Sequence, residues 1–304
     1  MKLTVIGAGG SVGGPAAFYA GVQRLVDEIV LLDVRHNVAE QHAIDLGTAV
    51  AALDVKVKAG AYEDLAGSDV VINAAGVPQG LISDRMELLA KNLPLVSDIA
   101  HNIKRYCPEA FVITATNPID PLNYAAWRAG GFDRRKVVGY SVNDSARFRQ
   151  MVAHKKGVAV SRVQATVIGE HGSSQVYLFS SVRIDGRPVL FTEEEKASIR
   201  AEIPGILKRL EELQAGRTAG WTSAMGLTAL ARAVLQNTGE VMPCSVVLDG
   251  EYGRKDLSIS VPVRLGREGV REIQELEMTA DERKGFERSA DAMAEAAKTV
   301  RENL

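Results

Sequence analysis

The feature that most constrains the fold is a run of glycines between an apolar segment and a helical one at the start of the chain. Leu3 to Ile6 have the composition of a buried strand, and a small-residue helix is predicted from about Ser11 to Gly21. Gly7, Gly10 and Gly13 lie in and around the turn between them. A strand, a glycine-rich turn and a helix in this order are typical of the first unit of a dinucleotide-binding sheet.

The spacing of these glycines departs from the common form. The pattern G-x-G-x-x-G fails because Val12 occupies the last glycine position, whereas G-x-x-G-x-x-G fits. Either spacing removes side chains where the backbone approaches a pyrophosphate, and the helix N-terminus, with Ser11 and Val12 beside it, faces the anion. A glycine turn that only permits tight packing of strand and helix is the alternative interpretation.

An acidic residue at the end of the next strand favours the cofactor interpretation. Asp33 follows the predicted strand Ile29 to Leu32 and lies 20 residues after Gly13. There its carboxylate can accept hydrogen bonds from the adenine ribose hydroxyls. Its charge would repel a 2′-phosphate, which favours NAD over NADP, but Arg35 lies close by and weakens that preference.

The remainder of the first half alternates short apolar runs with helical patterns, which predicts βαβ units and a parallel sheet. A helix is predicted from Met86 to Tyr106 because its apolar residues recur with helical spacing. The further predicted strands are Val55 to Lys58, Val70 to Asn73, Phe111 to Thr114 and Lys136 to Val138. The fold class is therefore α/β, a Rossmann-type doubly wound parallel sheet, whose ligands bind at the carboxyl ends of the strands.

The second half has a different character and predicts a C-terminal α+β substrate domain. Its predicted strands are Val163 to Ile168, Val176 to Ile184, Val246 to Leu248 and Leu257 to Leu265. The last two are expected to pair antiparallel. Helices are predicted after the capping box that begins at Thr192 and again after Thr279. Since 304 residues exceed the usual size of one core, we expect two domains, residues 1–142 and 143–304.

Composition excludes several classes of partner. With 36 basic and 38 acidic residues the net charge is −2, so nothing indicates a nucleic acid or a membrane surface as partner. The two cysteines, Cys107 and Cys244, lie far apart, form no metal-ligand pair and fit a reducing compartment. No long apolar segment or leader is evident at the start. We expect a cytoplasmic protein without a bound metal.

One histidine of five stands in a chemically suggestive position. His171 follows the apolar strand that ends at Ile168 and is flanked by Gly169 and Gly172. A loop that presents one imidazole suits a general acid/base. Taken by itself, a histidine in such a loop is more often structural than catalytic.

A carboxylate and a guanidinium occur together at the head of a predicted helix. Asp144 and Arg147 are three residues apart, so their side chains project to one side. An acid can orient an imidazole, and an arginine can bind a substrate carboxylate. An exposed ion pair within the helix is the alternative.

These segments together resemble the L-lactate/malate dehydrogenase family along essentially the whole chain. Order and spacing match as well, and so does a late segment, Asp249 to Gly253. The matching segments are the glycine turn with Asp33, Ala75-Gly76-Val77-Pro78, Thr116-Asn117-Pro118-Ile119-Asp120, Asp144-Ser145-Ala146-Arg147 and Gly169-Glu170-His171-Gly172. The resemblance implies an NAD-dependent enzyme, a small 2-hydroxy or 2-oxo acid as substrate, and a homo-oligomer, either dimer or tetramer.

The resemblance also implies a role for each site residue. His171 would exchange the hydroxyl proton, Asp144 would hold the imidazole tautomer, and Arg147 would bind the substrate carboxylate. Arg85 would fold over the substrate and polarise its carbonyl, and Asn117 would hydrogen-bond near the nicotinamide and the substrate oxygen. The implied cofactor contacts are Gly7, Gly10, Ser11, Val12, Gly13, Asp33, Ala75, Gly76 and Asn117.

The chain departs from the family pattern where substrates are distinguished. Malate dehydrogenases of this family usually carry an arginine directly after the loop proline, but here that residue is Gln79. A buried second carboxylate without a cation is costly, so Gln79 argues against malate unless another residue supplies the charge. Trp221 falls where the family keeps a small residue beneath the substrate, or it is a packing residue displaced by a local shift. Ser173 replaces a common aspartate.

Three interpretations of function follow. The first is a 2-hydroxy acid dehydrogenase, with malate-like, lactate-like and unusual uncharged substrates all open. The second is a dinucleotide sensor without catalysis, against which the retained histidine, aspartate and arginines argue. The third is an NAD- and metal-dependent glycosidase, which we discount because neither cysteine is placed for a metal site.

Overall fold

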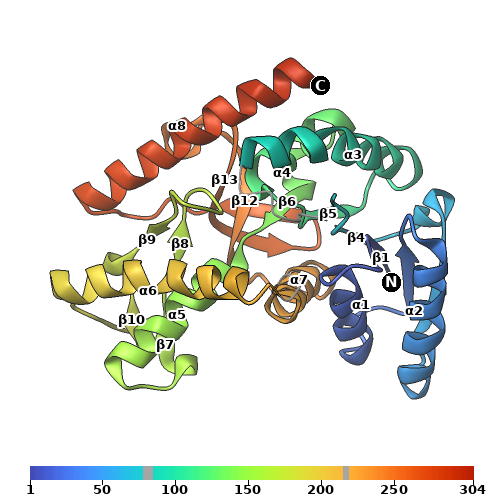
Figure 1. Cartoon of the computed structure of the whole chain (residues 1–304), viewed down its shortest axis with the longest axis horizontal. Helices are drawn as coiled ribbons and strands as arrows, with labels where there is room; N and C mark the ends of the chain where they lie inside the picture. Colours follow the sequence, from blue (N-terminus) through green and yellow to red (C-terminus); the bar gives the residue numbers. More distant parts are fainter. Residues whose placement is uncertain (78–84, 215–218) are drawn as a thin grey trace.

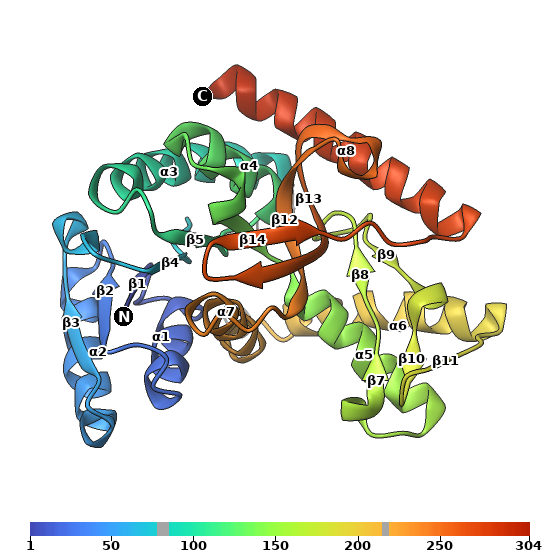
Figure 2. The same ribbon diagram turned by 180° about the vertical axis from the view of Figure 1, so that it is seen from behind.

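One nine-stranded sheet forms the centre of the molecule (Figures 1 and 2). The computed structural model describes residues 1–77, 85–214 and 219–304, with the backbone alone at positions 85, 207 and 211. The strand order is β14-β13-β12-β6-β5-β4-β1-β2-β3. These strands are β1 (Lys2–Ile6), β2 (Glu28–Leu32), β3 (Lys56–Ala59), β4 (Val70–Asn73), β5 (Phe111–Thr114), β6 (Val137–Tyr140), β12 (Val241–Asp249), β13 (Lys255–Gly266) and β14 (Gly269–Ile273).

The first six strands are parallel and have the predicted doubly wound order. Their residues are almost all buried in β1, β2, β4, β5 and β6, because helices cover both faces of a parallel sheet. On one face lie α1 (Gly13–Val22), α2 (His36–Ala49) and α7 (Gly220–Leu235), and on the other α3 (Arg85–Tyr106), α4 (Ile119–Gly130) and α8 (Ala280–Asn303) (Figure 1). The predicted fold class is confirmed.

The second half of the chain extends this sheet beyond β6 with three further strands. Strand β12 pairs antiparallel with β6, through Cys244 opposite Tyr140 and Ser245 opposite Gly139. Strand β13 then pairs antiparallel with β12, as predicted, and β14 follows at the edge. The C-terminal strands therefore lie directly beside β6, the last parallel strand. In such a fold, ligands bind at the carboxyl ends of the parallel strands.

A smaller layer lies beyond this edge (lower left in Figure 1). It contains α5 (Val142–Lys156), α6 (Glu193–Glu212), a sheet of β7 (Val163–Gln164), β10 (Arg183–Ile184) and β11 (Arg187–Pro188), and the pair β8 (Val167–Ile168) and β9 (Val176–Tyr177). The predicted continuous strands 163–168 and 176–184 were wrong, because each is broken into two-residue strands. Most of their apolar residues fill a separate core with Phe148 and Ile199, whereas Ile168, Val176 and Leu178 belong to the main core.

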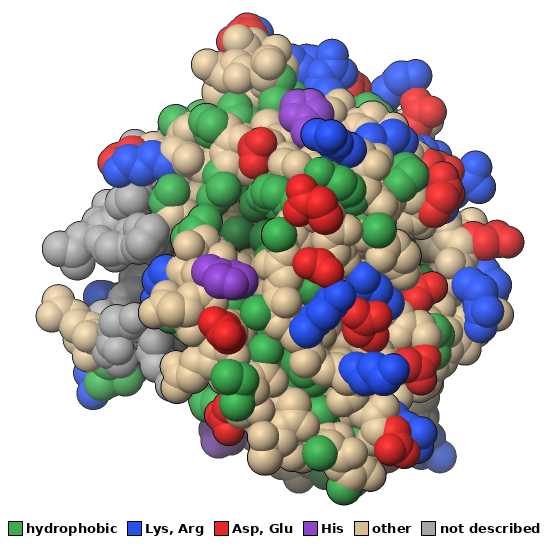
Figure 3. Space-filling model, turned by 90° about the vertical axis from the view of Figure 1, so that its right-hand side faces the viewer, with side chains coloured by type: hydrophobic (Ala, Val, Ile, Leu, Met, Phe, Trp, Pro, Cys, Tyr) green, Lys and Arg blue, Asp and Glu red, His purple; other side chains and the backbone are tan. Residues whose placement is uncertain are grey.

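Short 3-10 turns connect several of these elements. They span Ala51–Leu53, Tyr62–Leu65, Arg134–Lys136, Val160–Arg162, Phe179–Ser181 and Glu251–Gly253. On the face that Figure 3 turns to the viewer, acidic and basic side chains are interspersed with apolar ones. That mixture matches the near-zero net charge of the sequence.

Candidate active site

The loops that follow β1 and β4 come into direct backbone contact at the carboxyl edge of the sheet. Gly7 has φ +80°, and its N–H donates to the carbonyl of Leu32 at 2.8 Å. A Cβ at Gly7 would lie 2.6 Å from the nitrogen of Ala75, and a Cβ at Gly13 would lie 2.3 Å from the Gly7 oxygen. These two positions therefore require glycine. The same crowding brings two predicted cofactor segments, the glycine turn and Ala75-Gly76, together.

A buried asparagine on α3 ties the neighbouring loops to each other. Asn92 Oδ1 accepts the Val77 N–H at 2.8 Å, and Asn92 Nδ2 donates to the Asn117 carbonyl at 2.8 Å. The Thr116 hydroxyl donates to the Ala75 carbonyl at 2.5 Å. The side chain of Asn117 remains exposed at this edge. Sequence reasoning missed Asn92, whose only signal is a polar residue within an apolar helical pattern.

Asp33 lies beside the glycine turn, residues 7–13, which we call the dinucleotide cradle. Its side chain is 7% exposed, Oδ2 accepts the Gly9 N–H at 2.8 Å, and Oδ1 accepts the Arg35 N–H at 3.0 Å. The Arg35 guanidinium donates to the Gly9 carbonyl at 2.9 Å. A glycine turn that a Cβ would fill, a helix start and a carboxylate one strand away fit a pyrophosphate and a ribose. The residues present therefore fit a dinucleotide.

Backbone pairing holds the histidine loop in place. Gly169, with φ +92°, follows β8 and exchanges two backbone hydrogen bonds with Ser260 of β13, at 2.9 and 3.2 Å. The next N–H, that of Glu170, donates to Ser289 Oγ at 2.7 Å. The His171 N–H donates to Asp120 Oδ2 at 2.7 Å. Three successive residues are thus fixed through their main chain, and His171 has a defined position.

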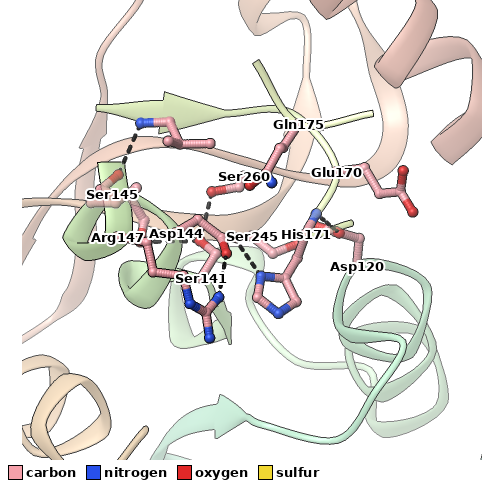
Figure 4. A network of polar contacts seen from close by, with 12 residues as sticks. Asp120, Ser141, Asp144, Ser145, Arg147, Glu170, His171, Gln175, Ser245 and Ser260 are labelled. Atoms are coloured by element: carbon pink, nitrogen blue, oxygen red, sulfur yellow. Dashed lines mark hydrogen bonds and ion pairs between the residues drawn. The ribbon is translucent and has the colours of Figure 1, made fainter. Parts of the chain in front are cut away.

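Figure 4 shows three of the four predicted catalytic side chains, His171, Asp144 and Arg147, side by side. Asp144 Oδ2 lies 2.5 Å from His171 Nδ1, and Asp144 Oδ1 lies 3.2 Å from Arg147 Nη1. The side chains of His171, Asp144 and Arg147 are 15%, 9% and 13% exposed. Asp144 lies in the first turn of α5, where the positive end of the helix dipole favours a carboxylate. The bare intrahelical ion pair is therefore only part of a larger cluster.

Electrostatics around His171 favour the imidazolium. Burial lowers the pKa of His171, but the nearby carboxylates of Asp144 and Asp120 oppose it, Arg147 adds a smaller lowering, and the net pKa is raised. Because an ionised carboxylate only accepts hydrogen bonds, His171 Nδ1 carries the proton in the contact with Asp144. The tautomer that results directs Nε2 away from Asp144, as a proton-exchanging group requires.

Two of the predicted substrate contacts, Gln79 and Arg85, lie wholly or partly outside the described residues. Gln79 lies outside the described residues, and Arg85 begins α3 with a side chain that also lies outside them. Trp221, on α7, is 68% exposed, which does not fit a side chain packed beneath a substrate. The preceding residue makes the close contact instead, since a Cβ at Gly220 would lie 1.8 Å from the Ser11 carbonyl oxygen.

Across residues 1–77, 85–214 and 219–304, no group of three or more His, Cys, Asp or Glu side chains is arranged to hold a metal ion. Over the same part of the chain, no helix is long and apolar enough to cross a bilayer.

A doubly wound dinucleotide site beside a carboxylate–imidazole pair and a partly buried arginine defines the class of nicotinamide-dependent dehydrogenases. Comparison with known proteins agrees. Residues 1–139 match the model of the lactate/malate dehydrogenase NAD-binding domain, and residues 143–304 match that of the lactate/malate dehydrogenase alpha/beta C-terminal domain. The chain belongs to the lactate/malate dehydrogenase family and is an NAD-dependent oxidoreductase of the 2-hydroxy acid type.

Proteins named malate dehydrogenase and proteins named lactate dehydrogenase are both similar to this chain. A malate dehydrogenase of Halobacterium salinarum is 38% identical over 297 residues, covering 96% of this chain and 97% of that protein. The crystal structure of Cryptosporidium parvum malate dehydrogenase superposes with a TM-score of 0.93 at 32% identity, covering 99% of both chains. The lactate dehydrogenase of the same organism, complexed with lactic acid and NAD, gives 0.92 at 33% identity, covering 99% of this chain and 98% of that one.

Proposed function

We propose that the chain interconverts a small 2-hydroxy acid and its 2-oxo acid, with His171 as general acid/base, Asp144 as its orienting group and Arg147 as the carboxylate-binding group. The observation that carries this proposal is the 2.5 Å contact between His171 and Asp144, with Arg147 on the other oxygen of the same carboxylate. An isolated ion pair or a packing histidine does not explain both contacts. They lie beside the cradle that fits the dinucleotide.

The chemistry divides between the cofactor and the chain. NAD, held at the glycine turn and Asp33, would supply the hydride acceptor for oxidation and, as NADH, the hydride donor for reduction. His171 Nε2 takes the hydroxyl proton during oxidation and returns it during reduction, while Nδ1–H stays hydrogen-bonded to Asp144. Asp144 stabilises the imidazolium that forms. Arg147, held by Asp144 through one nitrogen, offers its remaining N–H groups to the substrate carboxylate.

The supporting residues are assigned in the same way. We propose that Asn117 donates to the substrate oxygen or the nicotinamide, because its side chain is exposed where β5 ends. Arg85 closes over the substrate from the start of α3, and Gln79 faces the substrate tail. The cofactor contacts are Gly7, Gly10, Ser11, Val12, Gly13, Asp33, Ala75 and Gly76. Residues 1–142 bind the cofactor, and residues 143–304 supply the acid/base pair and Arg147.

The tail of the substrate is the open choice within this function. Malate is favoured by the names of similar proteins, such as the Halobacterium salinarum relative. An uncharged tail is favoured by Gln79, because a second carboxylate would lack its usual arginine partner. The crystal structure with lactic acid, at a similar TM-score, shows that the fold also serves an uncharged tail in that protein.

The test is NADH oxidation against pyruvate, oxaloacetate, 2-oxobutyrate, phenylpyruvate and hydroxypyruvate at equal concentration. Preference for oxaloacetate supports malate as substrate, and preference for any of the other four supports an uncharged tail. The variant Gln79→Arg is expected to shift the preference towards oxaloacetate. Unchanged substrate ratios would mean that Gln79 does not face the tail, and NADH binding without turnover on any acid would favour the sensor.

We also propose a cytoplasmic homo-oligomer. Four apolar side chains on two adjacent helices are about half exposed or more, Phe18 and Val22 on α1 and Trp221 and Met225 on α7. A surface of this kind is typical of subunit contacts. Cys107 and Cys244 are both free and buried, in keeping with a reducing compartment. Light scattering coupled to gel filtration measures the mass, and a monomer at micromolar concentration would contradict the oligomer.

A further inference from the structure

A second carboxylate lies behind the catalytic pair, and the proposed mechanism does not use it. Asp120, in the first turn of α4, is 1% exposed. Burial raises its pKa to about 6, although the Ser245 hydroxyl and the His171 N–H both lower it. A buried carboxylate is costly to keep in a fold unless hydrogen bonds or a function retain it. What Asp120 contacts therefore matters.

Both oxygens of Asp120 have defined partners. Oδ2 accepts the backbone N–H of His171 at 2.7 Å, and Oδ1 accepts the Ser245 hydroxyl at 2.5 Å. The Ser245 hydroxyl lies 2.9 Å from that of Ser258, and Asn123 Nδ2 donates to the Ser258 hydroxyl at 3.0 Å. All these side chains are buried. The network thus runs from α4 through β13 and β12 to Asp120 and ends on the main chain of the catalytic histidine. Figure 4 shows its last part, Ser245, Asp120 and His171.

The two carboxylates hold different ends of the same residue. Asp144 contacts the imidazole ring at Nδ1, whereas Asp120 contacts the main-chain nitrogen. The charged groups around His171 in the described residues are Asp144 and Arg147 from α5, Asp120 from α4 and Glu170 from its own loop. Asp120 and Asp144 both stabilise positive charge on the imidazole, and Arg147 opposes it.

We propose that Asp120 is a positioning residue for His171: its buried carboxylate anchors the histidine loop through the main-chain N–H, and its negative charge stabilises the imidazolium that forms during turnover. This inference rests on the acid/base role proposed above for His171. The plain alternative is that Asp120 only joins α4 to β12, in which case its charge has no effect on the titration of His171.

Asp120→Asn separates the two roles. The amide oxygen can still accept the His171 N–H, while the amide nitrogen donates to the Ser245 hydroxyl, whose own hydrogen can turn to Ser258. The anchor is kept and the charge is lost. Asp120→Ala removes both, and Asp291→Asn is the matched surface control, because Asp291 is 66% exposed and pairs only with Arg254 among the described contacts.

The measurement is the pH dependence of kcat/KM for the 2-oxo acid with saturating NADH, together with the NMR titration of the His171 ring. In Asp120→Asn the inflection and the ring titration both move to lower pH, because the pKa of His171 falls, while the maximal kcat changes less than about threefold. Asp120→Ala shows the same displacement and a kcat lower by roughly 10- to 100-fold, the effect of a catalytic group misplaced by about 1 Å. Asp291→Asn shows neither.

Two results would overturn the proposal. An Asp120→Asn enzyme with the wild-type inflection and the wild-type ring titration means that the charge does not act on His171. An Asp120→Ala enzyme with normal kcat means that the anchor is dispensable, and if that variant does not fold, Asp120→Asn decides alone. The proposed function fails separately, when the wild-type protein turns over no 2-oxo acid or His171→Asn retains full turnover.

Discussion

The contact between Asp144 and His171 sets a measurable rate penalty for its loss. The two side chains are 9% and 15% exposed, and Oδ2 and Nδ1 are 2.5 Å apart. For unit charges centred about 4 Å apart, at an effective dielectric constant of about 20, the attraction is about 4 kcal/mol. This energy exists only when the imidazole is protonated, so it acts on the proton transfer and not on cofactor binding.

Asp144→Asn removes that energy in proportion to the charge that has developed on the imidazole. If the transition state for alcohol oxidation carries roughly half of the charge, the barrier rises by about 2 kcal/mol, which is about a 30-fold loss of kcat/KM. The asparagine amide can also donate to Nδ1, which places the proton on Nε2 and blocks its use as a base. The loss is therefore expected to be at least about 30-fold.

The assay is steady-state NAD⁺ reduction with the preferred 2-hydroxy acid, with NADH affinity measured by fluorescence on the same preparation. The inflection of the pH profile moves to lower pH, because burial still lowers the pKa of His171 while its largest opposing charge is gone. Asp133→Asn, at an exposed position, is the control. A variant at position 144 with less than a threefold loss and an unmoved inflection would refute the assigned role of the pair.

Three further outcomes are expected. His171→Asn leaves NADH binding nearly intact and lowers turnover by about 10²-fold or more, and near-normal turnover would remove the histidine from the mechanism. Asp33→Ser, with Arg35 retained beside the loop, raises the ratio of kcat/KM for NADPH to that for NADH by roughly tenfold or more, because a like charge facing a phosphate is lost. An unchanged ratio means that Asp33 does not face the ribose. Gly220→Ala overpacks the contact between α7 and the glycine-rich turn, where a Cβ would lie 1.8 Å from a carbonyl oxygen. The cost of about 1–3 kcal/mol lowers Tm by about 2–8 °C and weakens NADH binding, and a wild-type melting curve would contradict this contact.

The parallel half of the fold could be predicted closely from the sequence. Strands Val70–Asn73 and Phe111–Thr114 have the predicted bounds, and the others differ by one or two residues at one or both ends. The reason is physical: a strand buried on both faces is a short, continuous apolar run, which few other elements produce. Helix α4 was not predicted, and nearly all of its residues are buried.

The region from 163 to 188 shows the limit of the same reasoning. Apolar residues such as Val163, Val167 and Phe179 are buried, as predicted, but they do not form long strands. Hydrophobicity reports that a side chain is buried and does not report which backbone groups it pairs with. Burial was therefore predictable in this region and pairing was not.

The candidate site, too, could be predicted only in part. His171, Asp144 and Arg147 lie in short motifs, so sequence can identify them, yet their contact joins residues 27 apart. The partners of Asp120 lie 51 and 125 residues away, and no local period indicates them. The motifs do not indicate these long-range contacts, which depend on the strands that the second half of the chain adds to the sheet.

The antiparallel hairpin explains why the missed residues are polar. Ser258 and Ser260 alternate with apolar residues along β13, which by itself fits a strand with one wet face. In the structure both serines are buried, at 2% and 3% exposure, because that face meets the starts of α4 and α5 instead of water. Ser260 pairs with the histidine loop through its backbone and with Ser141, the residue that precedes α5, through its hydroxyl. This face of β13 packs against two segments whose polar groups need hydrogen-bond partners. Serine supplies a small hydroxyl for them, whereas a larger apolar side chain would leave those groups unpaired.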